Sequence, residues 1–416
     1  MSVADGAGAA TATPVAELDL PSFEFADASL VGERFHAVME DLRSRSWLAR
    51  VEPVGYVVLD REAVAHFMRS PSATFPGRVM LEVHGIVDGP MYERTKGNIM
   101  DLNGEPHRRL RRLVQPAFTP QAADRWRPAM RRHLESLFEP VAAGARCDFV
   151  DAVAKPYPAR IIAELLGAPA EDVPRLEEWA NLLQASFDPI RLATERDRLE
   201  RANVEFDEYS WELLRARRES PGDDLLSELI AAQEEGDRLS DAECVHLIGA
   251  VLVGGVDTTQ AQLAHGIRLF AERPEQWRAL AEDPSLVPAA VEELLRFEPI
   301  TPFTARIALE EIEYRGVTFP EGTIVVAAAV TANRDPAEYD DPGAFDVTAE
   351  RGREKPLTFG AGPHFRLGAN LARAELQEAL AYLAPRMPGL EPDGEPEYET
   401  PFGVYGLGRL PVRWSA

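Results

Sequence analysis

Cysteine is scarce in this sequence, and its scarcity argues against two classes of protein. The chain has two cysteines, Cys147 and Cys244, in 416 residues. Two cysteines cannot form the disulfide framework of a small secreted domain, and their separation does not match the paired spacing of a metal site. We therefore expect neither a disulfide framework nor a cysteine-bound metal centre.

A long apolar run is also missing. The longest one, Leu247–Val256, is far shorter than the roughly 20 residues that cross a bilayer, and an Asp-Thr-Thr sequence follows it. The first fifteen residues are rich in Ala, Gly and Thr, without the basic start and apolar core of a signal peptide. We predict a disordered tail over residues 1–20 and a soluble, cytoplasmic protein that does not enter a membrane.

Positive charge is the third property in short supply. Lys and Arg number 44 against 69 Asp and Glu, so the formal net charge is -25 at pH 7. Such a chain repels phosphates, which argues against nucleic acid as a partner. Internal repeats and linker-like segments are absent as well. We therefore predict that residues 21–416 form one domain.

What is present is mostly helical. Helical patterns run from about residue 105 to about residue 300, and strand patterns are confined to two zones. In the first zone, residues 51–60 predict a strand that leads into a helix over residues 61–69. In the second, residues 312–319 and 324–329 predict a hairpin across a Pro-Glu-Gly turn. The expected fold class is α+β, mostly α with a small β region near each end.

One predicted helix is unusual. Ser240 and Glu243 form a capping-box pattern ahead of a long apolar segment, which predicts a buried helix over residues 241–271, about 45 Å long. Its centre reads Gly-Gly-Val-Asp-Thr-Thr over residues 254–259, where each glycine costs about 1 kcal/mol relative to alanine. One interpretation is a kink where another element packs closely. The other is a widened turn beside a ligand, which the clustered acid and hydroxyls favour.

Three further motifs follow in order along the chain. Glu293 and Arg296 form an E-x-x-R pair on one face of a predicted helix, a pattern that is weak by itself because solvated helices often carry it. Residues 333–336 read Asn-Arg-Asp-Pro. Residues 359–368 read Phe-Gly-Ala-Gly-Pro-His-Phe-Arg-Leu-Gly and lead into a helix predicted over residues 369–383.

Together these motifs resemble the bacterial cytochromes P-450, whose signature is Phe-Gly-x-Gly-x-His-x-Cys-x-Gly. The resemblance runs from about residue 30 to the end and includes the helix His107–Val114. It implies the triangular cytochrome P-450 fold of a monooxygenase, with haem b between the long central helix and the haem-binding loop 359–368. It also implies a small apolar substrate, held by residues 80–100, the Phe187 region and the start of the central helix. A ferredoxin is the implied redox partner, with Arg108, Arg109 and Arg112 as a basic dock.

The resemblance also assigns roles to individual residues. Asp257 and Thr258 match the catalytic pair that relays protons. Glu293 and Arg296, with Arg351 as third partner, match a structural group that braces the haem-binding loop. Four positions match residues that hold the haem propionates: His107, Arg111, Arg306 and His364. The remaining cofactor-binding positions lie in the loop itself: Phe359, Gly362, Arg366 and Gly368.

Arg366 departs from the signature, because it occupies the position of the cysteine that binds the iron. The family's thiolate favours O–O cleavage, whereas a guanidinium stays protonated and has no lone pair to offer. We therefore predict a protein that still holds haem, with non-thiolate ligation and with oxygenation impaired or altered. His364 is a minority candidate for the metal ligand. Neither Cys147 nor Cys244 is expected near the loop in this fold.

Two other interpretations remain open at this stage. One is a haem-free member with no cofactor, acting as a cofactor-independent enzyme or as an accessory of a partner enzyme such as a glycosyltransferase in natural-product metabolism. The other is an ordinary monooxygenase scaffold with a single inactivating substitution. The sequence therefore leaves undecided whether the protein is an active oxidoreductase.

Overall fold

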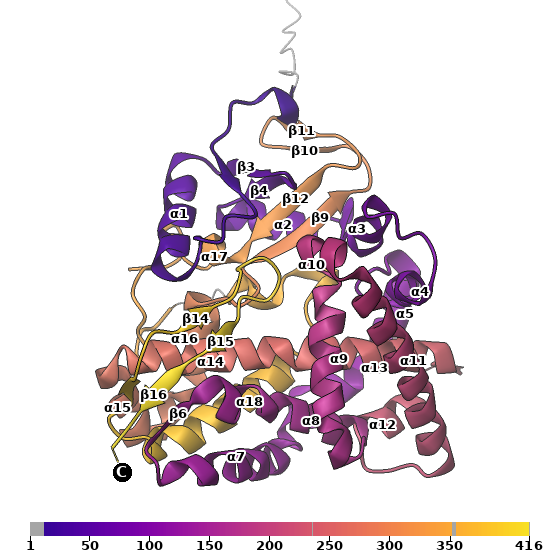
Figure 1. Cartoon of the computed structure of the whole chain (residues 1–416). Helices are drawn as coiled ribbons and strands as arrows, with labels where there is room; N and C mark the ends of the chain where they lie inside the picture. Colours follow the sequence, from indigo (N-terminus) through magenta and orange to yellow (C-terminus); the bar gives the residue numbers. More distant parts are fainter. Residues whose placement is uncertain (1–11, 235, 352–354, 416) are drawn as a thin grey trace, which may run out of the picture.

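Helices form the broad base of the molecule, and the larger β-sheet lies towards its narrow apex (Figure 1). The structure is a computed structural model, and it describes residues 12–234, 236–351 and 355–415. It confirms the predicted fold class, mostly α with small β regions.

Most helices bury one apolar face, and two predicted boundaries, 61–69 and 369–383, match the structure. The helix over 61–69 begins where the Asp60 side chain accepts a hydrogen bond from the Ala63 amide. The helices are α1 (Gly32–Arg45), α2 (Arg61–Arg69), α3 (Gly77–Val83), α4 (Pro90–Gly97), α5 (Gly104–Val114), α6 (Pro120–Asp124), α7 (Arg127–Ala142), α8 (Pro156–Leu166), α9 (Val173–Ala185), α10 (Pro189–Thr194), α11 (Arg196–Glu219), α12 (Leu225–Ala231), α13 (Asp241–Gly255), α14 (Asp257–Ala271), α15 (Pro274–Glu282), α16 (Val287–Phe297), α17 (Ala329–Ala332) and α18 (Ala369–Leu383).

The larger sheet joins strands that are far apart in the sequence. Its order is β2 (Ser22–Glu24), β3 (Leu48–Glu52), β4 (Gly55–Val58), β12 (Ile324–Ala328), β9 (Phe303–Ala308) and β5 (Ala73–Thr74). At its centre β4 runs parallel to β12, with Val57 opposite Val326. Both residues are buried in the core between the sheet and α1.

The remaining strands form small sheets. These are β1 (Thr13–Pro14) with β11 (Val317–Phe319) and β10 (Ile312–Tyr314), β13 (Glu391–Pro392) with β16 (Pro411–Arg413) and β6 (Arg146–Asp148), β14 (Glu397–Tyr398) with β15 (Leu407–Arg409), and β7 (Gln233–Glu234) with β8 (Asp237–Arg238).

Both strand predictions need correction. Residues 51–60 were expected to form one strand, but β3 and β4 form a hairpin that turns at residues 53–54. The predicted hairpin across residues 320–322 is also wrong, because β10 pairs with β11 and β12 belongs to the larger sheet. The actual turn is at Arg315-Gly316, where both residues have positive φ, the geometry of a tight two-residue hairpin.

The predicted central helix is present as α13 and α14, which meet at Val256. Both hydrogen bonds of the capping box between Ser240 and Glu243 are formed. The two glycines near the junction differ in their surroundings. A Cβ at Gly255 would lie 2.5 Å from Ile162 Cδ1 of α8, whereas a Cβ at Gly254 would meet nothing within 4 Å. Close packing therefore explains Gly255, and Gly254 faces open space.

The predicted N-terminal tail extends too far. Residues 1–11 lie outside the described residues, but residues 12–20 do not form a free tail. Thr13 and Pro14 pair with Val317 and Thr318 of β11, and Val15 is buried. The β-branched Val15 side chain packs in a core with Phe319, which fixes this part of the chain.

The segment Asp241–Ala271 is long and apolar enough to cross a membrane by length and composition. A core helix of a soluble protein passes the same test. Here the first half of the segment packs against α8, α9 and α11 within the molecule.

Candidate cofactor site and substrate pocket

The loop 359–368 approaches α2 closely before it enters α18. Gly362 has φ +72°, and a Cβ there would lie 3.0 Å from the Arg69 Cα, so both conformation and space favour glycine. Phe359 is buried, and the Arg373 guanidinium stacks over its ring at 4.7 Å. At Gly368, by contrast, an added Cβ would meet no atom within 4 Å, so space does not require glycine there.

Basic side chains of α5, β9 and the loop itself gather here without acidic partners among the described residues. His107 of α5 lies against His364, with ring centroids 4.3 Å apart. Burial, together with the charges of His107, Arg306 and Arg111, lowers the pKa of His364 to about 4. Burial also lowers the pKa of Arg111. Within the described part of the chain, no carboxylate opposes these shifts.

Arg366 belongs to this cationic cluster. Its Nη1 donates a long hydrogen bond of 3.4 Å to the Thr358 carbonyl oxygen. Burial lowers the pKa of Arg366 to about 10. The pKa of Arg306 also falls to about 10, first through burial and then through the charge of Arg366. The two guanidinium groups therefore repel each other, and an anion placed between them would stabilise both.

The central helix contributes an acid and a hydroxyl beside Gly254. Burial raises the pKa of Asp257 to about 7, and its Oδ1 has no hydrogen-bond partner. The Thr258 hydroxyl donates to the Gly254 carbonyl oxygen at 2.6 Å. Gly254 is exposed although the helix crosses the middle of the molecule. Asp257 can therefore hold or release a proton near neutral pH at the junction of α13 and α14.

Glu375 of α18 is an acid that sequence reasoning missed. It is buried, its Oε2 has no partner, and burial raises its pKa well above the usual range, opposed only by a hydrogen bond with Thr259. The available signal was an acid at a position that the apolar periodicity of residues 369–383 turns inward. It is a second buried acid with a raised pKa beside the central helix.

The structure brings Glu293, Arg296 and Arg351 together. Arg296 binds both carboxylate oxygens of Glu293, at 2.7 and 2.8 Å, and Arg351 approaches them at 2.7 and 3.2 Å. The remaining donors of Arg296 reach the carbonyl oxygens of Asn333 and Ala344. This fully bonded group ties α16 to the segment that precedes the loop 359–368.

Comparison with known proteins identifies the family. The family model for cytochrome P-450 matches residues 33–384. The chain belongs to the cytochrome P-450 family.

Its relatives agree with this assignment. Luteothin monooxygenase of Streptomyces thioluteus is 36% identical over 406 residues, 96% of this chain and 97% of that protein. Nocardicin C N-oxygenase of Nocardia uniformis subsp. tsuyamanensis is 39% identical over 325 residues, 76% of this chain and 79% of that protein. The crystal structure of CalO2 superposes with a TM-score of 0.87 at 29% identity, covering 95% of this chain and 99% of CalO2. This cytochrome P-450 is thus related to bacterial oxidoreductases of secondary metabolism.

Haem is the family's cofactor, and the residues of this cytochrome P-450 fit one part of it. The propionates of haem are anionic, and His107, Arg111 and Arg306 offer cationic or donor groups that no carboxylate satisfies among the described residues. Open space also lies beside Gly254 on the central helix. The iron ligand does not fit, because Arg366 cannot coordinate a metal.

The cysteines offer no substitute ligand. Cys147 lies in β6 and Cys244 in the first turn of α13. Burial raises the pKa of Cys147 to about 12 and that of Cys244 to about 11. Both are therefore neutral thiols at pH 7, and neither belongs to the loop 359–368. No group of three metal-ligating side chains occurs in the described ranges of the chain.

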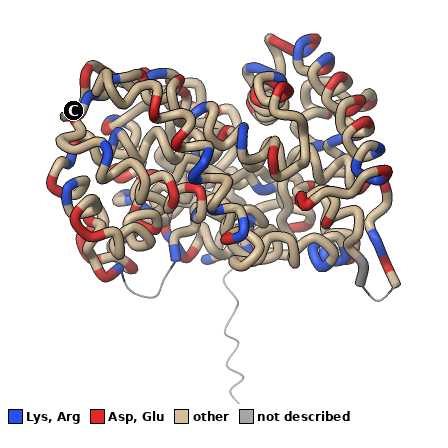
Figure 2. Tube along the Cα trace, turned by 90° about the horizontal axis from the view of Figure 1, so that it is seen from below, with Lys and Arg blue, Asp and Glu red and all other residues tan. Residues whose placement is uncertain are grey.

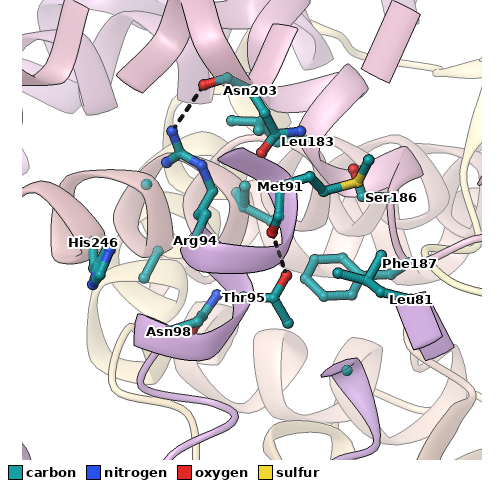
Figure 3. Close-up of a pocket in the computed structure, with 14 residues that line it drawn as sticks. Leu81, Met91, Arg94, Thr95, Asn98, Leu183, Ser186, Phe187, Asn203 and His246 are labelled. Carbon is teal, nitrogen blue, oxygen red and sulfur yellow. Dashed lines mark hydrogen bonds between the residues drawn. The ribbon is translucent and has the colours of Figure 1, made fainter. Parts of the chain in front are cut away.

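A pocket lies where the substrate was expected, between α3, α4, α9, α11 and α13 (Figure 3). It draws on all three predicted segments, with Met91 from residues 80–100, Phe187, and Gly249 of the central helix among its lining. Its lining is more polar than predicted, because Arg94 and His246 also face it.

The predicted basic dock is largely neutralised within the chain. Arg109 pairs with Asp237 and Glu243, each at 2.5 Å, and Arg108 pairs with Glu105 at 3.0 Å. Seen from the base, acidic and basic residues are interspersed over the molecule (Figure 2). Cytochromes P-450 act on small substrates and use redox partners such as ferredoxins, but α5 offers less free positive charge than its sequence suggests.

Proposed function

We propose that this cytochrome P-450 holds haem without thiolate ligation, and that its oxygenation is impaired or altered because Arg366 stands at the ligand position. The observation that carries the proposal is the cationic cluster, in which Arg366 lies close enough to Arg306 to lower its pKa. This cluster offers binding groups for two carboxylates but no thiolate for iron.

Each residue of the cluster then has a role that its contacts support. His107, Arg111, Arg306 and His364 would hold the haem propionates, with His364 also the nearest imidazole to the ligand position. Bound haem would supply redox and oxygen chemistry. Asp257 would hold a proton at its unpartnered Oδ1, and Thr258 keeps its hydroxyl beside Gly254. Glu293, Arg296 and Arg351 would keep the haem-binding loop in place.

The Arg366 charge opposes normal function for an electrostatic reason. A thiolate donates electron density to the iron. A guanidinium beside the same face would instead donate no electrons and would make the electrostatic potential at the iron more positive. Any electron delivered by a ferredoxin-type partner would then reach a centre with altered redox properties. The substrate pocket would remain, because none of its lining residues belongs to the loop 359–368.

An absorption spectrum tests the proposal. Protein expressed with ample haem supply is read oxidised, and then reduced under carbon monoxide, beside the variant Arg366→Cys. We expect a Soret band of non-thiolate position in the wild type and a thiolate-type band with recovered oxygenase activity in Arg366→Cys. A thiolate-type band in the wild type would contradict the proposal.

Absence of any Soret band from the wild type would also contradict it. That result would favour the haem-free interpretation, an accessory of a partner enzyme or a cofactor-independent enzyme.

A further inference from the structure

Arg94 is a largely buried cation that the cofactor site does not use. It extends from α4 towards α11 and α13, and its side chain is 12% exposed. Its Nη2 donates to the Asn203 carbonyl oxygen at 3.2 Å and to Asp207 Oδ1 at 3.1 Å. Its Nε and Nη1 are buried without a hydrogen-bond partner. Two donors of a charged group are thus left unsatisfied, which is costly in a protein interior.

Asp207 compensates this charge only in part. Its side chain is 40% exposed, so water screens its attraction for the guanidinium. Burial still lowers the pKa of Arg94 despite the opposing effect of Asp207. The Phe206 ring, 5.1 Å from the guanidinium carbon, adds a cation–π contact but accepts no hydrogen bond from Nε or Nη1. The positive charge of Arg94 would therefore attract a second anion.

The backbone of the central helix is shaped around this side chain. A Cβ at Gly249 would lie 2.7 Å from Arg94 Nη1, so glycine lets the guanidinium lie against α13. In the same way, a Cβ at Gly97 would lie 1.9 Å from the His246 ring. Two glycines thus admit two basic side chains into the pocket, a placement that an apolar substrate alone would not require.

The opposite side of the pocket is apolar. Leu81 and Phe187 lie across from Arg94 and His246 (Figure 3), and Val253 continues the apolar lining along the central helix. An occupant that matches both sides has an anionic head and an apolar body. A carboxylate is the matching head, since it accepts charge-assisted hydrogen bonds from a guanidinium.

We propose that Arg94 binds the carboxylate of an amphipathic carboxylic acid, whose apolar part lies along Leu81, Phe187 and Val253. The inference deepens the proposed function, because it names the substrate class of the same cavity. It does not depend on the iron ligand, so binding can be measured whether or not the protein turns over.

Calorimetric titration of the full-length protein as purified tests the proposal, with decanoic acid as the probe and decanol as the uncharged match. We expect wild type to bind decanoate at least about tenfold more tightly than decanol. Arg94→Gln should abolish this preference while leaving the affinity for decanol unchanged. Lys96→Gln removes an exposed positive charge from the same helix and should leave both affinities unchanged.

Equal affinity of wild type for decanoate and decanol would overturn the proposal, as would failure to bind decanoate at millimolar concentration. Equal loss of both ligands in Arg94→Gln, with an unchanged circular dichroism spectrum, would reduce Arg94 to a structural residue. The Soret measurement is separate, so loss of the haem proposal and loss of this one give different results.

Discussion

Arginines in this protein occupy two opposite electrostatic environments. Arg296 is 1% exposed, but Glu293 and backbone carbonyls satisfy it. Arg366 and Arg306 face each other without an acid in the described residues. A buried charge that is paired and hydrogen-bonded is tolerated, whereas an unpaired one requires an external anion. The contrast separates a hydrogen-bonded group around Arg296 from an uncompensated pair that a bound anion would stabilise.

Removing Glu293 should therefore be far more damaging than removing a surface acid. Glu293→Ala leaves Arg296 and Arg351 without their carboxylate, and we expect a loss of about 3–5 kcal/mol in the free energy of unfolding. Asp41→Ala breaks the exposed Arg45–Asp41 pair and should cost less than about 1 kcal/mol. Urea denaturation of both variants measures the difference. Similar small losses would show that the group does not brace the loop.

At the scale of elements, the junction of α13 and α14 combines tight and open packing in adjacent residues. Gly255 touches α8 through Ile162, and Gly254 borders open space. One residue thus fixes the central helix against its neighbour, and the other leaves room on the side of Thr258.

Alanine substitutions separate these two functions. Gly255→Ala must displace Ile162, and we expect it to lower the free energy of unfolding by about 1–3 kcal/mol. Gly254→Ala meets no atom and should raise the stability of haem-free protein by up to about 1 kcal/mol through helix propensity. Thermal unfolding of the two haem-free variants gives the answer. Equal changes in the free energy of unfolding of Gly255→Ala and Gly254→Ala would mean that the difference in packing does not affect stability.

Local patterns predicted local structure well, and distant pairings poorly. The capping box of Ser240 and Glu243 and the spacing of Glu293 and Arg296 depend on residues within one helical turn, so both interactions could be read from the sequence. The β-branched run of β12 indicates a strand but not that β4 is its partner. The turn at Arg315 was missed because an arginine with positive φ carries weak turn signal.

The candidate site divides in the same way. The loop 359–368 was found through its signature, and Arg351 through the family resemblance rather than its position. Arg94 and Glu375 were missed, since each is one charged residue in an ordinary helical pattern. Their meaning depends on burial, which comes from neighbours distant in sequence, such as Gly249 and Thr259.

At the scale of the whole molecule, acid should destabilise the fold through buried histidine. His265 is fully buried, and burial lowers its pKa to about 3. Between pH 6.5 and about 4.5 the unfolded chain binds a proton there that the folded chain does not, so stability falls as the pH falls.

We expect His265 to account for about 2 kcal/mol of that loss. His265→Gln should flatten the dependence of unfolding free energy on pH over this window, whatever its effect at pH 7. Chemical denaturation at several pH values measures the slope. The half-buried His66→Gln is the control, because His66 is less buried than His265. An unchanged slope in His265→Gln would contradict the assignment.

The parallel pairing of β4 with β12 has a consequence for synthesis on the ribosome. Val57 emerges early, but its partner Val326 is made only after most of the chain. Thr13 likewise can pair with Val317 only after residue 317 has been synthesised. Until then the β3–β4 hairpin carries an uncovered strand edge, which invites association with other nascent chains. If translation is slow or stalls before residue 324, β4 has no β12 to pair with and the larger sheet cannot form. Expression yield should therefore depend on chaperones that shield this hairpin.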